Sequence, residues 1–329
     1  MWGTLVVFSL SAAFVVLAGW ELTRRAEKLA EHTGLGHAWI GAILLAGATS
    51  LPELSVDLIA VRSGTANFAT GDLFGSCMFN MLVLAVADLL TPQVRILTRV
   101  IIDQAMAGVL AIIVLALAAL GIVTASQLAP FGVGWATVLI GLAYLWGAWL
   151  LHATRRARVL PVPVGATPGQ MRFGLWQDAA RFAAATLVLV LAARLLIGAA
   201  TELVEQTGVT TGFFGIIVLA VVTSLPEIVV SIAGIRAGSY DLVVGNLLGS
   251  NAFNMVILFI LDVVDGGGPL LAHAEPSVLV GNLFAVVLTA LVVLGTLSQA
   301  EPRHRLLDPG ALPVVLAYGL GLAISYRMM

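Results

Sequence analysis

A five-residue motif, Thr-Ser-Leu-Pro-Glu, occurs twice in this chain of 329 residues. The first copy begins at Thr49 and the second at Thr223, so the copies lie 174 positions apart. The same separation aligns residues 33–88 with a second segment without a gap. The further matched pairs are Gly71 with Gly245, Ser76 with Ser250, Asn80 with Asn254 and Asp88 with Asp262. Chance matching of apolar residues does not align such a set, so the chain contains an internal repeat.

The repeat lies in a chain that has too few charges for a soluble protein. Hydrophobic residues make up 60% and charged residues 10%, whereas about a quarter of the residues in a soluble domain are charged. The net charge of −2 gives no basic surface for a nucleic-acid partner. The single cysteine, Cys77, excludes an intrachain disulfide and a cysteine zinc cluster. We therefore predict an all-α membrane protein in a lipid bilayer, with no cofactor.

Ten apolar stretches are long enough to cross a bilayer, which takes about 20 residues per helix. They divide into two sets of five, in residues 1–152 and 179–329, joined by a proline-containing linker at 153–178 that we predict to be cytoplasmic. The expected spans are 3–22, 36–61, 67–90, 100–121, 130–152, 179–200, 210–235, 241–264, 276–298 and 310–326.

The distribution of basic residues predicts how these spans are oriented. Cytoplasmic loops of membrane proteins carry an excess of Lys and Arg. Thirteen such residues fall in the loops after odd-numbered spans, whereas Arg62 and Arg327 lie on the other side. We therefore expect both termini outside the cell (inner) membrane. Because each repeat has an odd number of spans, the second copy is inverted, and the matched segments should meet near the midplane.

The repeated motif places proline and glutamate in the middle of an apolar span. Proline removes a helix hydrogen bond, so we expect free carbonyls around Ala46 to Thr49 and Ala220 to Thr223. A charged residue at this depth costs about 3 kcal/mol or more, and the matched spans have no basic residue at that level. Glu53 and Glu227 are therefore expected to bind a cation or a proton. Carboxylate, hydroxyl and carbonyl oxygens suit Ca²⁺, Na⁺ or Mg²⁺.

The next span of each copy supplies a second wall for this site. Ser76 and Asn80 are four residues apart, as are Ser250 and Asn254, so each pair lies on one helix face. Hydrogen bonding between helices is the alternative role for such residues. Their repetition beside a buried glutamate favours the ion site.

These segments resemble the two α-repeats of the sodium/calcium exchanger family, in the cation/Ca²⁺ antiporter superfamily. The resemblance rests on residues 47–80 and 223–254 and extends over nearly the whole chain. It implies exchange of Ca²⁺ for Na⁺ by alternating access, in a transporter rather than an enzyme, with one chain sufficient and the oligomeric state left open. By motif it assigns as ligands the carboxylates of Glu53 and Glu227, the hydroxyls of Thr49, Ser50, Ser76, Thr223, Ser224 and Ser250, the amides of Asn80 and Asn254, and the carbonyls of Ala46 and Ala220.

The sequence departs from the family pattern most clearly at Asp72. The family usually has Asn there, as this chain has at Asn246 in the second copy. Asp72 shares a helix stripe with Ser76 and Asn80, so it is either a third acidic ligand or proton site, or a hydrogen-bonding group between helices. An H⁺-coupled Ca²⁺ or Na⁺ antiporter of the same fold therefore remains an alternative. A cation channel is disfavoured, because a complete repeat pair in one chain favours a carrier.

Three other acidic residues are expected to play structural roles. Asp57, one turn beyond Glu53, either lines the path to the cation site or pairs with Arg62 near the end of its span, and we expect the pairing. Asp88 and Asp262 occupy matching span ends, so we expect them to be interfacial.

Overall fold

The computed structural model describes residues 2–91, 94–97, 102–129, 132–155, 168–207, 221–298 and 310–328. Within these ranges the regular structure is entirely helical, which confirms the all-α prediction. The α-helices are α1 (Trp2–Thr33), α2 (Gly36–Trp39), α3 (Ala46–Thr49), α4 (Leu51–Arg62), α5 (Ala66–Leu90), α6 (Ile102–Thr124), α7 (Trp135–Arg155), α8 (Pro168–Thr207), α10 (Leu225–Ala237), α11 (Tyr240–Asp265), α12 (Pro276–Ser298) and α13 (Ala311–Met328). A π-helix, η1 (Ile40–Leu45), joins α2 to α3, and a 3₁₀-helix, η4 (Leu270–His273), follows α11.

The helices have the length and surface of a multi-pass membrane protein. Among the described residues, seven helices are long and apolar enough to cross a membrane, and the bent pair Gly36–Thr49 and Leu51–Arg62 would make an eighth. Large apolar side chains such as Leu17, Leu145 and Leu294 are exposed on their surfaces, as contact with lipid requires. The expected span 210–235 lies partly outside the described residues, so the count of ten remains a prediction.

Two helices extend well beyond the spans expected from hydropathy. Helix α1 continues to Thr33, and α8 begins at Pro168, inside the predicted linker 153–178. Proline is well tolerated in the first turn of a helix, because the N–H that it lacks has no helical partner there. The connection between the two halves is therefore shorter than the apolar pattern indicated.

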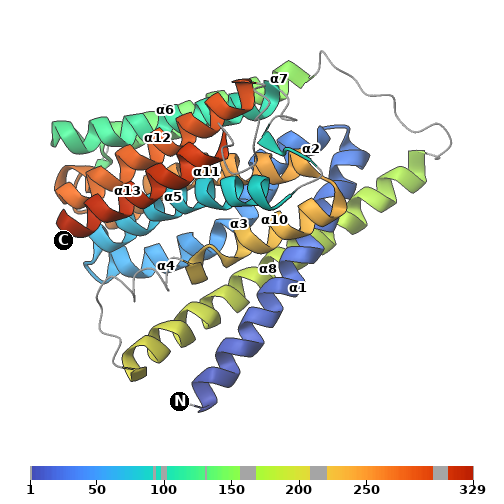
Figure 1. Ribbon diagram of the computed structural model, residues 1–329, viewed down its shortest axis with the longest axis horizontal. Coiled ribbons are helices and arrows are strands. Elements are labelled where there is room, and N and C mark those ends of the chain that lie inside the picture. Colours follow the sequence, from blue (N-terminus) through green and yellow to red (C-terminus); the bar gives the residue numbers. More distant parts are fainter. Residues whose placement is uncertain are drawn as a thin grey trace.

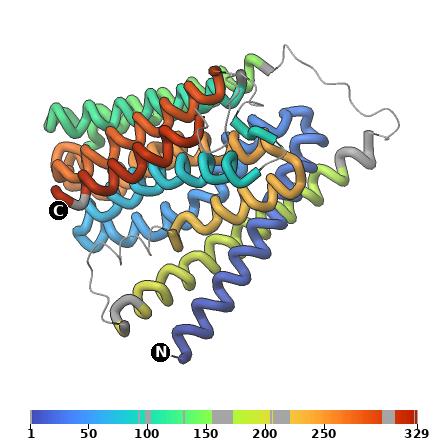
Figure 2. Tube along the Cα trace, viewed as in Figure 1, coloured from blue at the N-terminus to red at the C-terminus, as the bar shows by residue number. Residues whose placement is uncertain are grey.

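Helices α1 and α8 lie side by side along one flank of the molecule, and the remaining long helices form the body (Figure 1). A smaller apolar core, which includes Leu22 and Leu189, fills the α1–α8 interface. A larger core, which includes Phe74 and Leu115, lies among α5, α6, α11 and α12. Helices α4 and α10 pack against both parts (Figure 2). The two motif copies thus lie in the interior, where the two parts meet.

Close approach of two backbones fixes the position of α11 against the first motif copy. A Cβ added at Gly41 would lie 2.6 Å from the Leu242 carbonyl oxygen, and one added at Gly245 would lie 2.7 Å from the Ala38 carbonyl oxygen. Small residues allow helices to pack this closely in membranes. As a result, α11 presents its polar side chains directly to the residues that follow η1.

Candidate cation site

The two motif copies have the same backbone conformation at the helix break. Ser50 has φ −89° and ψ 0°, and Ser224 has φ −87° and ψ 10°. Each serine is followed by a new helix with proline in its first turn, α4 in the first copy and α10 in the second. The axis bends by 41° in the first copy. The predicted break at both prolines is therefore confirmed, and its cause is the missing proline N–H.

The break places a glutamate in the first turn of each new helix. Glu53 and Glu227 are each 1% exposed, and they lie close enough for their charges to interact. The partial positive charge at a helix N-terminus favours an anionic group there. Glu53 Oε2 and both carboxylate oxygens of Glu227 make no hydrogen bond of normal geometry in the described part of the chain, although the Thr49 hydroxyl lies near the Glu227 carboxylate. The two carboxylates are therefore available to a cation.

Thr49 connects the first motif copy to α11 of the second. Its hydroxyl lies 3.4 Å from Ser250 Oγ and 3.4 Å from Asn246 Oδ1. It also donates a hydrogen bond to the Ala46 carbonyl at 3.2 Å. Ser250 and Asn246 are fully buried, so the oxygens of the two copies meet in the interior, as the sequence predicts.

The expected free carbonyl at Ala46 is not found. The Ala46 oxygen accepts the Ser50 N–H at 3.0 Å as well as the Thr49 hydroxyl. The reason is one of register, because Pro52 would have donated to the residue four positions earlier, Ala48. The proline therefore does not leave the Ala46 carbonyl free, and the assignment of Ala46 as a ligand stays a prediction. The corresponding prediction for Ala220 lies outside the described residues.

Two predicted ligands, Asn80 on α5 and Asn254 on α11, are buried amides. Asn80 Nδ2 donates to Asn251 Oδ1 at 3.1 Å, and Asn254 Nδ2 donates to Cys77 Sγ at 3.9 Å. Each amide NH₂ group is thus engaged, while neither amide oxygen has a partner among the residues that the structure describes. This orientation of the amides leaves the side-chain oxygens of Asn80 and Asn254 free to coordinate a cation.

Unpartnered buried polar atoms are concentrated in the predicted site. Most buried polar atoms in proteins have a hydrogen-bond partner, so such a concentration requires an explanation. A hard cation that takes six to eight oxygen ligands would satisfy it. Within the described ranges, the predicted ligands with such an atom are Ser50, Glu53, Asp72, Ser76, Asn80, Ser224, Glu227 and Asn254. Thr223, the remaining hydroxyl, is buried beside them in sequence.

The site is not a cluster of acids alone. In the residues that the structure covers, no three His, Cys, Asp or Glu side chains converge to hold a metal ion. Asp72 lies within electrostatic range of Glu53, but it does not join both glutamates in a three-carboxylate centre. A cation between Glu53 and Glu227 would therefore depend on the neutral oxygens around it.

Sequence comparison between the copies missed Asn251. This fully buried residue accepts from Asn80 and donates to the Cys77 carbonyl at 3.1 Å and to Thr289 Oγ1 at 3.3 Å. It aligns with Cys77 in the repeat, so a search for identical pairs passes over it. The available signal was its position on α11, one residue after Ser250 and three before Asn254.

The expected pairing of Asp57 with Arg62 is wrong. Asp57 is fully buried and Arg62 is exposed, and neither Asp57 oxygen has a hydrogen-bond partner in the described residues. The two residues lie five positions apart in the helix, which places their side chains about 140° apart around its axis, so they do not share a face.

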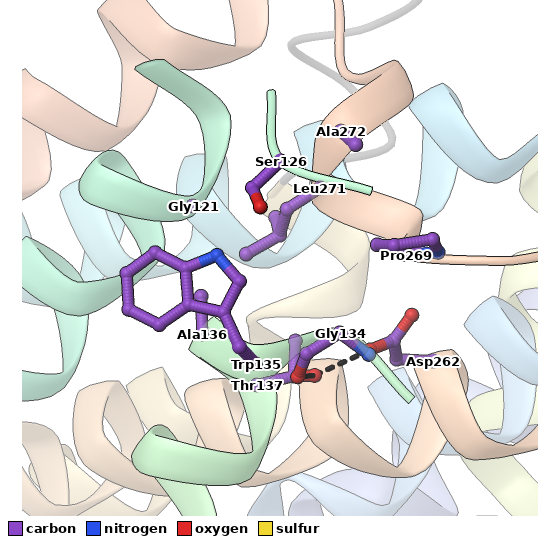
Figure 3. A pocket seen from close by; sticks show the side chains of 10 residues that line it. All are labelled: Gly121, Ser126, Gly134, Trp135, Ala136, Thr137, Asp262, Pro269, Leu271 and Ala272. Atoms are coloured by element: carbon purple, nitrogen blue, oxygen red, sulfur yellow. Dashed lines mark hydrogen bonds between the residues drawn. The ribbon is translucent and has the colours of Figure 1, made fainter. Parts of the chain in front are cut away.

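Asp88 and Asp262, which we expect to be interfacial, bind loop backbone where their helices end. Asp262 Oδ2 accepts the Gly134 N–H at 2.7 Å and the Thr137 hydroxyl, and its Oδ1 accepts the Leu270 N–H at 2.7 Å. Figure 3 shows this arrangement beside a small pocket at the α7 N-terminus. Asp88 Oδ1 similarly accepts the Leu97 N–H at 3.0 Å. Both aspartates are buried because they satisfy backbone donors where their helices end.

Comparison with known proteins identifies the family. The sequence profile of the sodium/calcium exchanger protein family matches residues 3–153 and 178–327. The chain belongs to the sodium/calcium exchanger family. Members of this family are membrane transporters and not enzymes, which confirms those two predictions.

Relatives of this exchanger-family chain are similar over most of their length. The putative antiporter CaxA of Alkalimonas amylolytica is 27% identical over 294 residues, which cover 84% of this chain and 87% of CaxA. The inner membrane protein YrbG of Escherichia coli is 29% identical over 299 residues, 83% of this chain and 85% of YrbG. The sodium-calcium exchanger NCX_Mj, in a structure soaked with 10 mM Na⁺ and zero Ca²⁺, has a TM-score of 0.75 at 18% identity and covers 99% of both chains. The fold is therefore that of NCX_Mj.

Proposed function

We propose that this chain is a secondary active antiporter that exchanges Na⁺ for Ca²⁺ by alternating access at a site between Glu53 and Glu227. The observation that carries the proposal is the concentration of buried, unpartnered oxygens from both motif copies around the two glutamates. The family supports cation antiport, and the donor set supports the choice of hard cations.

The same proposal includes the arrangement of the chain in the membrane. Ten spans would form two inverted five-helix units, residues 1–152 and 179–329, with both termini outside the inner membrane. Contacts that cross between the copies support this arrangement, for example Thr49 with Ser250. Helix breaks with their N-terminal ends at the site are typical of transporters built from inverted repeats.

Charge balance explains why such a site would exchange ions rather than release them on one side only. Two carboxylates balance one Ca²⁺ or two Na⁺. Without a cation, Glu53 and Glu227 would remain as two uncompensated charges in a medium of low dielectric constant, which is strongly unfavourable. The empty site would therefore reorient slowly across the membrane. Coupling follows, because each ion must be replaced by another before the site can return.

A second candidate function is H⁺-coupled antiport of Ca²⁺ or Na⁺ by the same fold. The observation that favours it is an excess of acidic groups in the first copy, where Asp57 and Asp72 lie within electrostatic range of Glu53. Protons could then take the place of Na⁺ as the coupling ion.

Uptake of ⁴⁵Ca²⁺ into proteoliposomes separates these functions. Na⁺/Ca²⁺ exchange predicts rapid uptake when Na⁺ is loaded inside and absent outside, and no uptake when only a pH gradient is imposed. Uptake driven by the pH gradient alone would replace the first function by the second. Uptake with neither gradient, at the rate seen with Na⁺, would contradict antiport.

A further inference from the structure

A second pair of carboxylates lies beside the first motif copy but has no counterpart in the second. Asp57 and Asp72 correspond, at the repeat separation of 174 positions, to Ser231 and Asn246. The central residues are the same in both copies, whereas these two positions carry two additional acids in one copy only. The two sides of the site therefore differ in the number of acidic side chains.

The two aspartates lie at the same level of one helical hairpin. Helices α4 and α5 pack together and are joined by a tight turn in which the Thr65 N–H donates to the Ala60 carbonyl at 2.9 Å. At about 1.5 Å per residue, Asp57 and Asp72 lie about 8 and 9 Å from that turn. Glu53 lies about 14 Å from it on the same measure. The aspartates therefore form a layer one helical turn closer to the turn than Glu53.

The layer contains oxygens that have no hydrogen-bond partner in the part of the chain that the structure describes. Asp57 is fully buried, and both of its oxygens lack a hydrogen-bond partner among the described residues, as does the buried Oδ2 of Asp72. The charges of Asp57 and Asp72 interact with each other. A buried charge that has no compensating partner is strongly unfavourable. The pair of buried acids therefore points to a ligand that compensates it.

We propose that Asp57 and Asp72 form a second cation site, one turn from Glu53 toward the α4–α5 turn, that binds Ca²⁺. The proposal rests on the proposed function, because it assigns this layer to the path of the same cation. Two carboxylates supply two negative charges and hard oxygen ligands, which match a divalent ion of this kind. The second copy has Ser231 and Asn246 instead, so Ca²⁺ would pause on one side of the central site and not on the other. By the predicted orientation that side is the outside.

Equilibrium binding of ⁴⁵Ca²⁺ to the purified full-length protein tests the second site. The variant Glu53→Gln/Glu227→Gln removes the charge of the central site. We expect it to retain Ca²⁺ binding, and we expect that binding to be lost when Asp57→Ser and Asp72→Asn are added, which install the residues of the second copy. Equal Ca²⁺ binding by the two variants, or none by the first, would overturn the proposal.

Two controls guard against loss of fold and against a general effect of charge. The single change Asp72→Asn, in the same background, removes half of the pair and should weaken the retained binding. Asp265→Asn removes an exposed acid at the end of α11 and should leave Ca²⁺ binding unchanged; weakening equal to that of Asp72→Asn would contradict a local site.

Na⁺-driven ⁴⁵Ca²⁺ uptake by the unmodified chain is measured in parallel. Absence of that uptake refutes the proposed function, whereas intact uptake with equal binding by the variants refutes the second site alone.

Discussion

Cys77 and Asn251 hold each other through reciprocal contacts. Asn251 Nδ2 donates to the Cys77 carbonyl at 3.1 Å, and Cys77 Sγ donates to the Asn251 carbonyl at 3.7 Å. The two residues are separated by 174 positions, the separation of the motif copies. Each also accepts the amide of a predicted ligand from the other copy, Asn80 at Asn251 and Asn254 at Cys77. These hydrogen bonds thus link α5 to α11 where the copies meet, and they orient the side-chain amides of Asn80 and Asn254.

Replacing Asn251 tests whether its hydrogen bonds to Cys77 and Asn80 support the cation site. Asn251→Ala removes the acceptor of the Asn80 amide and leaves buried donors and acceptors unpaired, which costs about 1–3 kcal/mol. We expect a lower melting temperature together with weaker Ca²⁺ binding, measured by thermal unfolding and calorimetry.

Asn282→Ala provides the matched control for that variant. Asn282 is also fully buried and donates to the Leu115 carbonyl at 3.2 Å, away from the site. It should lower the melting temperature while leaving Ca²⁺ affinity unchanged. If the two variants weaken Ca²⁺ binding equally, Asn251 has no particular role at the site.

The two glutamates should be individually essential. Glu53→Gln and Glu227→Gln each leave Ca²⁺ with one compensating charge where two are needed, so we expect ⁴⁵Ca²⁺ uptake in proteoliposomes to fall to the background of empty vesicles. Both variants should still elute as the folded protein. Glu31→Gln makes the same chemical change at an exposed position of α1 and should transport normally. Near-normal uptake by either site variant would show that the ligands are elsewhere.

Competition between the two ions should appear at equilibrium. If Na⁺ and Ca²⁺ use the same oxygens, raising Na⁺ must lower the apparent affinity for Ca²⁺ in proportion to the Na⁺ bound. Calorimetric titration of Ca²⁺ at low and high Na⁺, with choline replacing Na⁺ to hold ionic strength constant, measures this. An affinity for Ca²⁺ that does not change with Na⁺ would favour H⁺ coupling instead.

A buried ion pair should hold α1 to α8. Arg25 Nη1 lies 2.6 Å from Asp178 Oδ1, and both side chains are less than a tenth exposed. Removing one partner leaves the other charge buried, which typically costs about 3–5 kcal/mol, so Asp178→Asn should lower the melting temperature markedly. The double change Arg25→Met/Asp178→Leu should recover much of the loss. Glu21→Gln, at the more exposed partner of Arg25, should have a small effect; a large one would assign the stability to that pair instead.

The helix break and its glutamates could be predicted because they depend on local chemistry. Proline at position 52 or 226 removes a helix hydrogen bond and clashes with the preceding turn, so a kink or break is expected at each position from the local sequence alone. The π-helix at Ile40–Leu45 could not be predicted, because its extra residue per turn leaves no mark in a uniformly apolar stretch. The free carbonyl expected at Ala46 from the proline is wrong, because the Ser50 N–H donates to that oxygen.

Residues whose role depends on a distant partner were harder to predict. Asn251 becomes important only because α5 brings Asn80 and Cys77 against it, and its own segment does not indicate this contact. Asp57 was assigned to Arg62 as the nearest opposite charge in sequence, but the helix turns the two side chains apart. The internal repeat supplied part of this missing information. It indicated, before the packing of the helices was known, which two segments meet.

The most direct test of the central claim is to locate the ion. Crystals of the full-length protein grown with Ca²⁺, or with Sr²⁺ in its place, give anomalous scattering from the bound cation. We expect an anomalous peak between the carboxylates of Glu53 and Glu227, within about 2.3–2.6 Å of their oxygens for Ca²⁺, which disappears when the crystals are transferred to high Na⁺. A cation bound elsewhere with none between these two glutamates, or a peak there that high Na⁺ leaves in place, would contradict it.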